Sequence, residues 1–167
     1  MSKQLTFIPG APKFLKSASF HLKICRVGEP EPSYKMDAPE LAFQFWNSII
    51  ARQDWFDENK EQLVVLLLST RYNIQGYSLV SMGTINESIA HPRESFRVAV
   101  ATGAYAMILM HNHPSGDPSP SQSDHSLTRR FAEAAELLQI KLLDHVVVGR
   151  AEEGRQGYFS FKEAGVL

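Results

Sequence analysis

The sequence predicts a mixed α/β fold in which strands and helices pack in layers. Two continuous apolar runs, residues 63–68 and 104–110, are typical of central strands that are covered on both faces. Helix signals lie around these runs, at 37–50, 91–103 and 119–138, where apolar residues recur at helical spacing or capping residues mark a start. This alternation of strand and helix is typical of layered α/β domains.

The first half of the domain is expected to hold one helix and two strands. Asp37 is predicted to cap the helix, with Glu40 completing a capping box. The apolar residues that share one face of this helix are Leu41, Ala42, Phe45, Trp46, Ile49 and Ile50. Glu61 opens the first central strand, and a second strand is expected over 75–82, after a turn at 71–73.

The second half of the domain carries further start and stop signals. Pro92 and Glu94 suit the first turn of a helix, and Gly103 suits its left-handed end. Residues 104–110 then form a strand that delivers His111 at its end. The other predicted elements are a helix capped by Ser119, with Pro120 at its first position and Gln122 completing a capping box, and strands over 140–149 and 157–161.

Residues 1–36 are predicted to be an N-terminal extension, and residues 37–167 the compact domain. Alternating polar and apolar residues over 19–25 indicate one short strand in the extension. The stretch at 28–33, rich in proline, then indicates a linker. The single cysteine, Cys25, excludes an internal disulfide and a multi-cysteine metal site.

Charge and hydropathy bear on the partners of the chain. The net charge is −1 and the pI is about 6.6, so no overall basic surface favours nucleic acid. The run at 63–68 is too short to span a bilayer, and residues 1–17 lack the apolar region of a signal peptide. We therefore expect a cytoplasmic protein without membrane or nucleic-acid partners, and the oligomeric state is not indicated.

His111 and His113 are spaced to bind one metal ion. Alternate strand residues point to the same face, and their Cα atoms lie roughly 6–7 Å apart. Pro114 ends the strand, and the next helix brings back Ser121 and Asp124 on one face. If that face looks towards the strand end, Asp124 becomes the third ligand. Two histidines and one carboxylate leave a fourth position for water, as in catalytic zinc sites.

Each of these pairs alone has a simpler explanation. His111 and His113 would suit a polar strand end, and Ser121 and Asp124 would suit the first turn of a helix. Together, with the turn between them, they favour a metal site. A hydrolytic site would also need a glutamate that transfers a proton and a hydroxyl that stabilises an oxyanion. Ser121 is placed for the second role, whereas spacing does not locate the glutamate.

Other ionisable residues have less specific interpretations. Asp144 and His145 interrupt a buried strand, where one of them could orient a metal ligand from behind, or both could form a satisfied core pair. Asp117 is expected to be a turn residue, His125 an exposed residue and His91 a helix cap.

The string His111-x-His113-Pro114, followed by Ser121-x-x-Asp124, resembles the JAMM motif of the JAB/MPN metalloprotease family. The strings Gly83-Thr84-Ile85-Asn86, Pro92-Arg93-Glu94 and Leu143-Asp144-His145 are similar to those of its RadC-like branch. The likeness covers roughly residues 37–167. It implies the JAB/MPN fold, a cytidine-deaminase-like mixed sheet flanked by helices. It also implies Zn²⁺ at His111, His113 and Asp124, with Ser121 assisting.

The resemblance further implies a catalytic glutamate at the start of the first central strand, where Glu61 stands. Glu94 is the alternative general base, because it belongs to the Pro-Arg-Glu string. The implied function is a zinc-dependent metallopeptidase or isopeptidase that acts on a peptide or an isopeptide-linked protein. The alternative is a RadC-like module with a DNA-repair-associated or protein-binding role and little or no hydrolysis.

Two further functions are disfavoured. The letters His-Asn-His do not indicate a nuclease of that name, because Ser121-x-x-Asp124 has no place in its ββα scheme. A deaminase would need Pro-Cys-x-x-Cys ligands, which are missing. We find no helix-hairpin-helix segment ahead of the domain, so the sequence itself lends no support to a DNA-repair role.

Overall fold

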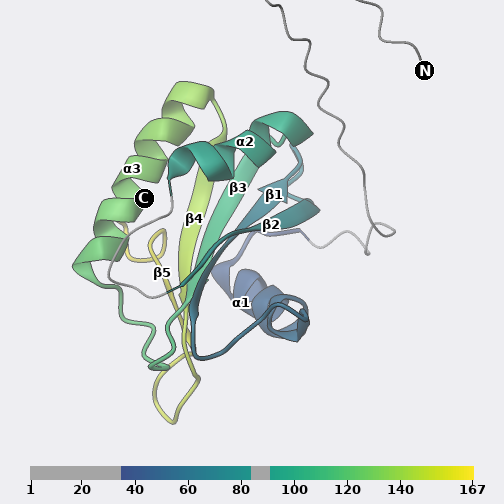
Figure 1. The fold of residues 1–167 in the computed structure, drawn as a ribbon. Coiled ribbons are helices and arrows are strands. Elements are labelled where there is room, and N and C mark those ends of the chain that lie inside the picture. Colours follow the sequence, from purple (N-terminus) through teal and green to yellow (C-terminus); the bar gives the residue numbers. More distant parts are fainter. Residues whose placement is uncertain (1–34, 84–90) are drawn as a thin grey trace, which may run out of the picture.

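The computed structural model describes residues 35–83 and 91–167, which form one five-stranded sheet with helices on both faces (Figure 1). The predicted strand at 19–25 and the linker at 28–33 lie outside the described residues, and the division of the chain at residue 36 stays a prediction. The elements in chain order are α1 (Pro39–Ser48), a short 3-10 helix (Ile50–Arg52), β1 (Glu61–Leu68), β2 (Ile74–Gly83), α2 (Pro92–Thr102), β3 (Ala106–Asn112), α3 (Gln122–Leu138), β4 (Lys141–Val148) and β5 (Tyr158–Ser160).

The sheet is mixed and has the strand order β2-β1-β3-β4-β5. Strand β1 runs antiparallel to both β2 and β3, whereas β3 and β4 are parallel, and β5 is antiparallel to β4. The parallel pair is joined through α3, because parallel neighbours need a crossover connection. Strands β1 and β3 lie at the centre and are buried along almost their whole length, which is why they read as continuous apolar runs.

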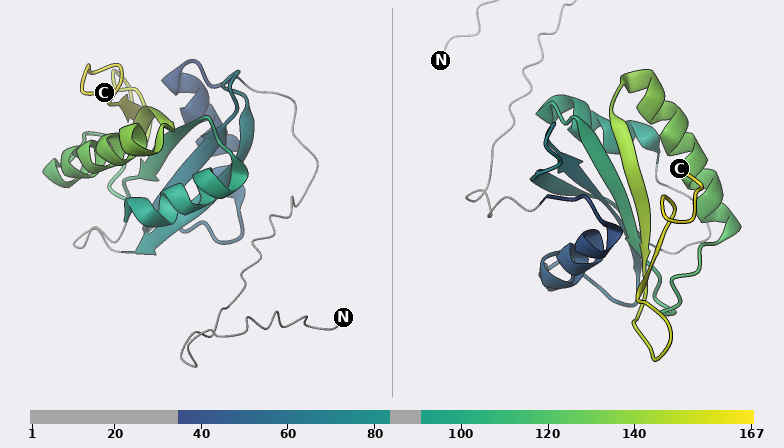
Figure 2. Two further views of the ribbon diagram at one scale, coloured as in Figure 1. Left: turned by 90° about the horizontal axis from the view of Figure 1, so that it is seen from above. Right: turned by 180° about the vertical axis from the view of Figure 1, so that it is seen from behind.

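Helices α2 and α3 cover one face of the sheet, and α1 covers the other (Figure 2). On the first face, Val65 and Leu109 from the central strands pack with Phe96 and Phe131. On the second face, Trp46 of α1 lies in a separate apolar cluster. This arrangement confirms the predicted fold class. Because strand side chains alternate, the odd-numbered residues of β1 and β3 face α2 and α3.

The start of α1 differs from the prediction. Its N-cap is Ala38, with Pro39 in the first turn and no side-chain cap. Asp37 instead pairs with Lys35, whose Nζ lies 2.9 Å from its carboxylate. Proline is suited to the first helical position because its φ is already helical and it has no N–H that needs a partner. The prediction that Asp37 caps this helix is therefore wrong.

The start of α3 also differs. Its N-cap is Ser121, whose hydroxyl accepts from the backbone N–H of Asp124 while the Asp124 carboxylate accepts from the N–H of Ser121. The predicted cap, Ser119, instead donates its backbone N–H to Asp117 in the preceding loop. The capping box thus begins two residues later than predicted. Strand β3 likewise extends to Asn112, so the first histidine of the motif lies inside the strand and not at its end.

The bounds of α2 confirm the prediction for this helix. It starts at Pro92 and ends at Gly103, whose φ of +66° is the left-handed conformation that favours glycine. His91 occupies the N-cap position, but its side chain makes no capping hydrogen bond.

Within the described residues, no helix combines the length and the apolar character that crossing a bilayer requires.

Candidate metal centre

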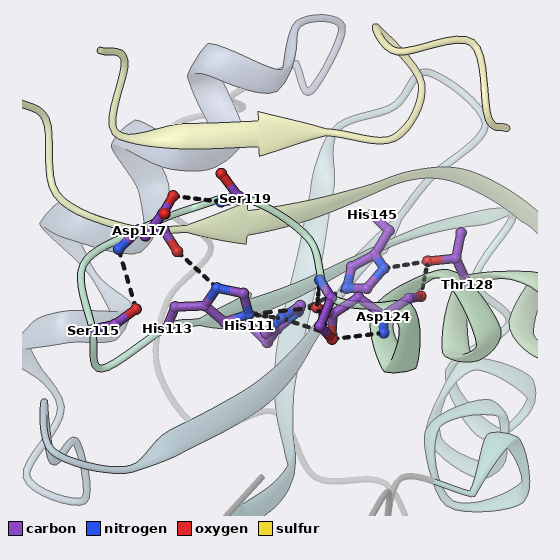
Figure 3. Close-up of polar contacts among 9 residues, drawn as sticks. His111, His113, Ser115, Asp117, Ser119, Asp124, Thr128 and His145 are labelled. Carbon is purple, nitrogen blue, oxygen red and sulfur yellow. Dashed lines mark hydrogen bonds and ion pairs between the residues drawn. The ribbon is translucent and has the colours of Figure 1, made fainter.

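His111, His113 and Asp124 converge at the end of β3 (Figure 3). The Nε2 atoms of the two histidines are 3.1 Å apart. Nε2 of His111 lies 3.2 Å from Oδ1 of Asp124, and Nε2 of His113 lies 3.5 Å from Oδ2. His111 is fully buried and Asp124 nearly so, whereas the His113 side chain is 13% exposed. The cluster therefore opens towards solvent on the side of His113.

The capping box of α3 aims the Asp124 carboxylate at the histidines. The backbone N–H and the hydroxyl of Ser121 both donate to Oδ2 of Asp124, over 2.6 and 2.7 Å. Oδ1 is then the oxygen that faces His111. The Ser121 hydroxyl hydrogen is therefore used to hold Asp124. Its predicted role as an oxyanion donor stays a prediction, and that role requires the hydroxyl to turn away from Asp124.

The loop after β3 orients His113. Its Nδ1 lies 2.7 Å from the backbone carbonyl oxygen of Asp117. A carbonyl only accepts, so Nδ1 carries a hydrogen, and Nε2 is the nitrogen that faces the cluster. The Asp117 carboxylate meanwhile accepts from the backbone N–H of Ser119, which confirms that Asp117 is a turn residue.

His145 and Asp144 have different roles on β4. His145 is fully buried, and its Nε2 lies 2.8 Å from Nδ1 of His111, directly behind the cluster. The Asp144 carboxylate instead accepts hydrogen bonds from the Ser160 hydroxyl and from the backbone N–H groups of His145 and Lys162. Asp144 thus joins β4 to the end of the chain, whereas His145 contacts the candidate site.

The charges in the cluster favour a cation. Burial tends to raise the pKa of Asp124, but hydrogen bonds from His111 and His113 outweigh it and hold this pKa well below the ordinary value. Burial tends to lower the pKa of His113, but its hydrogen bond to Asp124 and the Asp117 carbonyl raise this pKa above the ordinary value. Two imidazole nitrogens and a carboxylate oxygen form the donor set of many catalytic zinc sites, so the residues present fit this ion.

Glu61 lies beside the cluster at the first position of β1. Leu63 pairs with His111 across the two strands, and counting two residues along each strand places Glu61 opposite His113. Oε2 of Glu61 is buried without a hydrogen-bond partner among the described residues. Burial is the main reason that the pKa of Glu61 is raised, and the Asp124 charge adds to it. A buried carboxylate oxygen without a partner is unusual, and together with the raised pKa it makes Glu61 a candidate functional residue.

Asn112, which the sequence analysis did not single out, positions Glu61. Its side-chain oxygen accepts from the backbone N–H of Gln62, and its side-chain nitrogen donates to the carbonyl of Lys60, both over 2.9 Å. The two bonds hold the backbone immediately before and after Glu61. The signal for this role is a polar amide in a fully buried strand, but the identity of its partners depends on strand register.

Glu94 lies elsewhere, on the surface of α2. Its side chain is 40% exposed, and its two oxygens pair with Arg93 and Arg97, each at 3.2 Å. This is the structural ion pair that a helix start favours, and the structure does not bring Glu94 into the His–His–Asp cluster. His125 was expected to be exposed but is half-buried, with its ring 5.0 Å from that of Phe161.

The connection between β4 and β5 braces the loop that follows β3. The backbone N–H of Arg150 donates to the carbonyl oxygen of Gly116 over 2.8 Å, and Arg155 reaches the same oxygen at 3.4 Å. Gly149 lies so close that a Cβ there would meet the Gly116 carbonyl oxygen and Pro118. Residue 149 must therefore be glycine for the two loops to pack as they do.

Comparisons with known proteins place the chain among its relatives. The model of the RadC-like JAB domain matches residues 37–166. A UPF0758 protein of Trichlorobacter lovleyi is 44% identical over 133 residues, which cover 80% of this chain and 54% of that protein. A second, from Symbiobacterium thermophilum, is 38% identical over 150 residues, covering 90% of this chain and 60% of that protein. A third, from Pelobacter propionicus, is 49% identical over 111 residues, covering 66% and 46%.

The matched regions cover 46% to 60% of the length of these three relatives. The chain thus spans about half the length of the relatives it matches. The matched region contains all of β1 to β5 and the whole His–His–Asp cluster. The chain belongs to the RadC-like JAB domain family.

Proposed function

We propose that this domain is a zinc-dependent hydrolase that cleaves an amide bond in a peptide or an isopeptide-linked protein. The observation that carries the proposal is a His–His–Asp donor set beside the Glu61 carboxylate, whose buried Oε2 has no hydrogen-bond partner among the described residues. A structural zinc site has four protein ligands, whereas a catalytic site has three and keeps one position open. Three ligands and an adjacent general base are the parts that a zinc hydrolase needs.

His111 and His113 would hold the ion through Nε2, and Asp124 through Oδ1. Zinc, when bound in such a site, supplies Lewis-acid activation of water and of a substrate carbonyl at neutral pH. Two neutral imidazoles and one carboxylate carry a single negative charge. They would therefore leave a divalent ion with net positive charge, which the chemistry requires.

Glu61 would serve as both general base and general acid. Its Oε2 accepts one proton from the attacking water, and the same oxygen then donates this proton to the amine nitrogen as the C–N bond breaks. The products are a carboxylic acid and an amine, and Glu61 returns to its ionised form. Burial raises the pKa of Glu61 above its ordinary value, which suits a group that must first accept and then donate a proton.

The substrate would approach from the side of His113 and Ser121. His111 is fully buried beneath the sheet–helix junction, whereas His113 is partly exposed and Ser121 is exposed. A hydroxyl at this position could donate to the oxyanion of a tetrahedral intermediate once it leaves the Asp124 carboxylate. Ser121 would then contribute in two ways, by positioning Asp124 and by stabilising charge.

The test compares two glutamate variants on a peptide and on a model substrate with a lysine ε-amino isopeptide bond. We expect Glu61→Gln to keep its zinc and lose hydrolysis by about 100-fold or more, as is typical for loss of a general base. Glu94→Gln is the matched control and should keep full activity, because its carboxylate pairs with the surface residues Arg93 and Arg97. If Glu94→Gln lost activity while Glu61→Gln kept it, the general base would be Glu94 and not Glu61. Wild-type protein that binds zinc but hydrolyses neither substrate would favour the alternative, a binding or DNA-repair-associated module.

A further inference from the structure

A chain of hydrogen bonds behind His111 decides which of its nitrogens is available to the cluster (Figure 3). Oγ1 of Thr128 lies 2.6 Å from the carbonyl oxygen of Asp124 and 2.6 Å from Nδ1 of His145. Nε2 of His145 lies 2.8 Å from Nδ1 of His111. Thr128, His145 and His111 are each at most 1% exposed, so solvent offers them no competing partners.

The direction of each bond follows from the groups involved. A hydroxyl has one hydrogen, and Thr128 must donate it to Asp124, because a carbonyl oxygen can only accept. Towards His145, Thr128 can therefore only accept, so Nδ1 of His145 carries a hydrogen. The two ring nitrogens of His145 face a hydroxyl and another imidazole, and neither supplies a counter-ion for a positive ring. A neutral His145 then has a bare Nε2, which accepts from His111.

We propose that Thr128 and His145 are positioning residues that lock His111 in the tautomer with its hydrogen on Nδ1. Nε2 of His111 is then the nitrogen that faces His113 and Asp124 and is left to bind the ion. The opposite tautomer would place a hydrogen on Nε2 and block coordination. The purpose of this arrangement rests on the proposed metal site, but the position of the hydrogen does not depend on whether the domain hydrolyses anything.

The two candidate histidine ligands are oriented in different ways. His113 donates the hydrogen on its Nδ1 to the Asp117 carbonyl. Such a bond is common for metal-binding histidines, and it permits only one neutral tautomer of His113. His111 faces an imidazole, which can either donate or accept. The hydroxyl of Thr128 removes that ambiguity, and its bond to Asp124 ties the chain to the same helical turn that supplies the carboxylate ligand.

The test measures the ring nitrogens of histidine by ¹⁵N NMR in the metal-free full chain at neutral pH. We expect Nδ1 of His111 and Nδ1 of His145 each to carry a hydrogen. Thr128→Val keeps the size of the side chain but removes the acceptor. This variant should lose the Nδ1–H form of His145 and weaken zinc binding about 10- to 100-fold, as loss of such outer partners does elsewhere. Thr128→Ser keeps the hydroxyl and should retain both properties.

Thr102→Val is the matched control. The Thr102 hydroxyl also donates to a carbonyl one turn back, that of Val98 at 2.9 Å, but it lies at the end of α2 without a histidine partner in the described part of the chain. This variant should change neither the tautomers nor zinc affinity. A His111 in the wild type without hydrogen on Nδ1 would overturn the proposal, as would unchanged tautomers in a folded Thr128→Val. The expected hydrogen positions in a protein without hydrolysis would support the proposal and remove only the proposed function.

Discussion

Asn112 fixes the backbone of Gln62, and thereby the position of the neighbouring Glu61. Its side-chain oxygen accepts the N–H of Gln62, and its nitrogen donates to the carbonyl of Lys60. Asn112 itself is the last residue of β3 and stands between His111, in the strand, and His113, which follows it. One buried amide therefore ties the start of β1, where the candidate base lies, to the end of β3, beside the two candidate histidine ligands.

We predict that Asn112→Ala weakens both the fold and catalysis. The variant leaves the buried N–H of Gln62 without its partner, which should reduce the free energy of unfolding by about 1–3 kcal/mol. Zinc binding should persist, while hydrolysis falls about 10- to 100-fold because Glu61 loses its fixed position. Urea unfolding, zinc content and turnover measure the three effects. Asn59→Ala is the control, because the exposed Asn59 side chain bonds to Asp57 in the turn before β1, and equal behaviour of the two variants would contradict the role of Asn112.

Ser121→Ala should affect both the helix start and the metal site. Loss of the N-cap hydroxyl is expected to lower the free energy of unfolding by about 1 kcal/mol. Zinc affinity should also fall, because Asp124 loses one of the donors that orient its carboxylate. Ser126→Ala provides the comparison, since its exposed hydroxyl donates to the Gln122 carbonyl on the same helix. Isothermal titration with zinc should separate the two variants, and matching affinities would count against the positioning role of Ser121.

The stability of the metal-free protein should depend on pH through Glu61. Burial raises the pKa of this carboxyl in the folded state above its ordinary value. Below its unfolded-state pKa of about 4.5, the group is protonated in both states and does not lower the free energy of unfolding. As pH rises through the folded-state pKa, the unfolded chain has already released its proton, so the free energy of unfolding falls.

Glu61→Gln isolates this effect, because it cannot ionise. In the presence of a chelator, the variant should gain stability relative to wild type as pH rises from acid to neutral. Added zinc should reduce this difference in the free energy of unfolding. Urea unfolding at several pH values gives the difference directly. A difference that stays constant with pH would show that Glu61 ionises freely in the folded protein.

Gly149→Ala should disturb the site from a distance. The added Cβ would meet the Gly116 carbonyl oxygen and Pro118, so the loop that orients His113 must shift. We expect a loss of about 1–3 kcal/mol in the free energy of unfolding and weaker zinc binding. Gly76→Ala is the control, because a Cβ at that position meets no atom within 4 Å. Equal melting temperatures for the two variants would mean that the two loops are not tightly packed.

The parts of the fold that the sequence predicts best are those governed by burial. Strands β1 and β3 are covered on both faces, so their apolar runs identify them without knowledge of their neighbours. The beginning of α3 was harder to place, because Ser119 and Ser121 both begin a pattern that suits a capping box. The choice between them depends on Asp117, which engages the backbone of Ser119.

The histidine and aspartate spacing likewise predicts a cluster that the structure does bring together. The residues that support the cluster could not be found in this way. Thr128, His145 and Asn112 meet their partners only through strand register and the packing of α3 on β4, which are separated by many residues in the chain. A polar residue in a buried strand indicates that some partner exists, but only the fold identifies it.

The central claim is that His111, His113 and Asp124 hold a metal ion, and metal analysis of the purified chain tests it most directly. We predict about one zinc ion per chain after incubation with zinc and removal of the excess. His113→Ala should lose this zinc, whereas His125→Ala should retain it, because His125 packs against Phe161 outside the cluster. Wild-type protein that stays free of zinc, or His113→Ala that keeps it, would contradict the account.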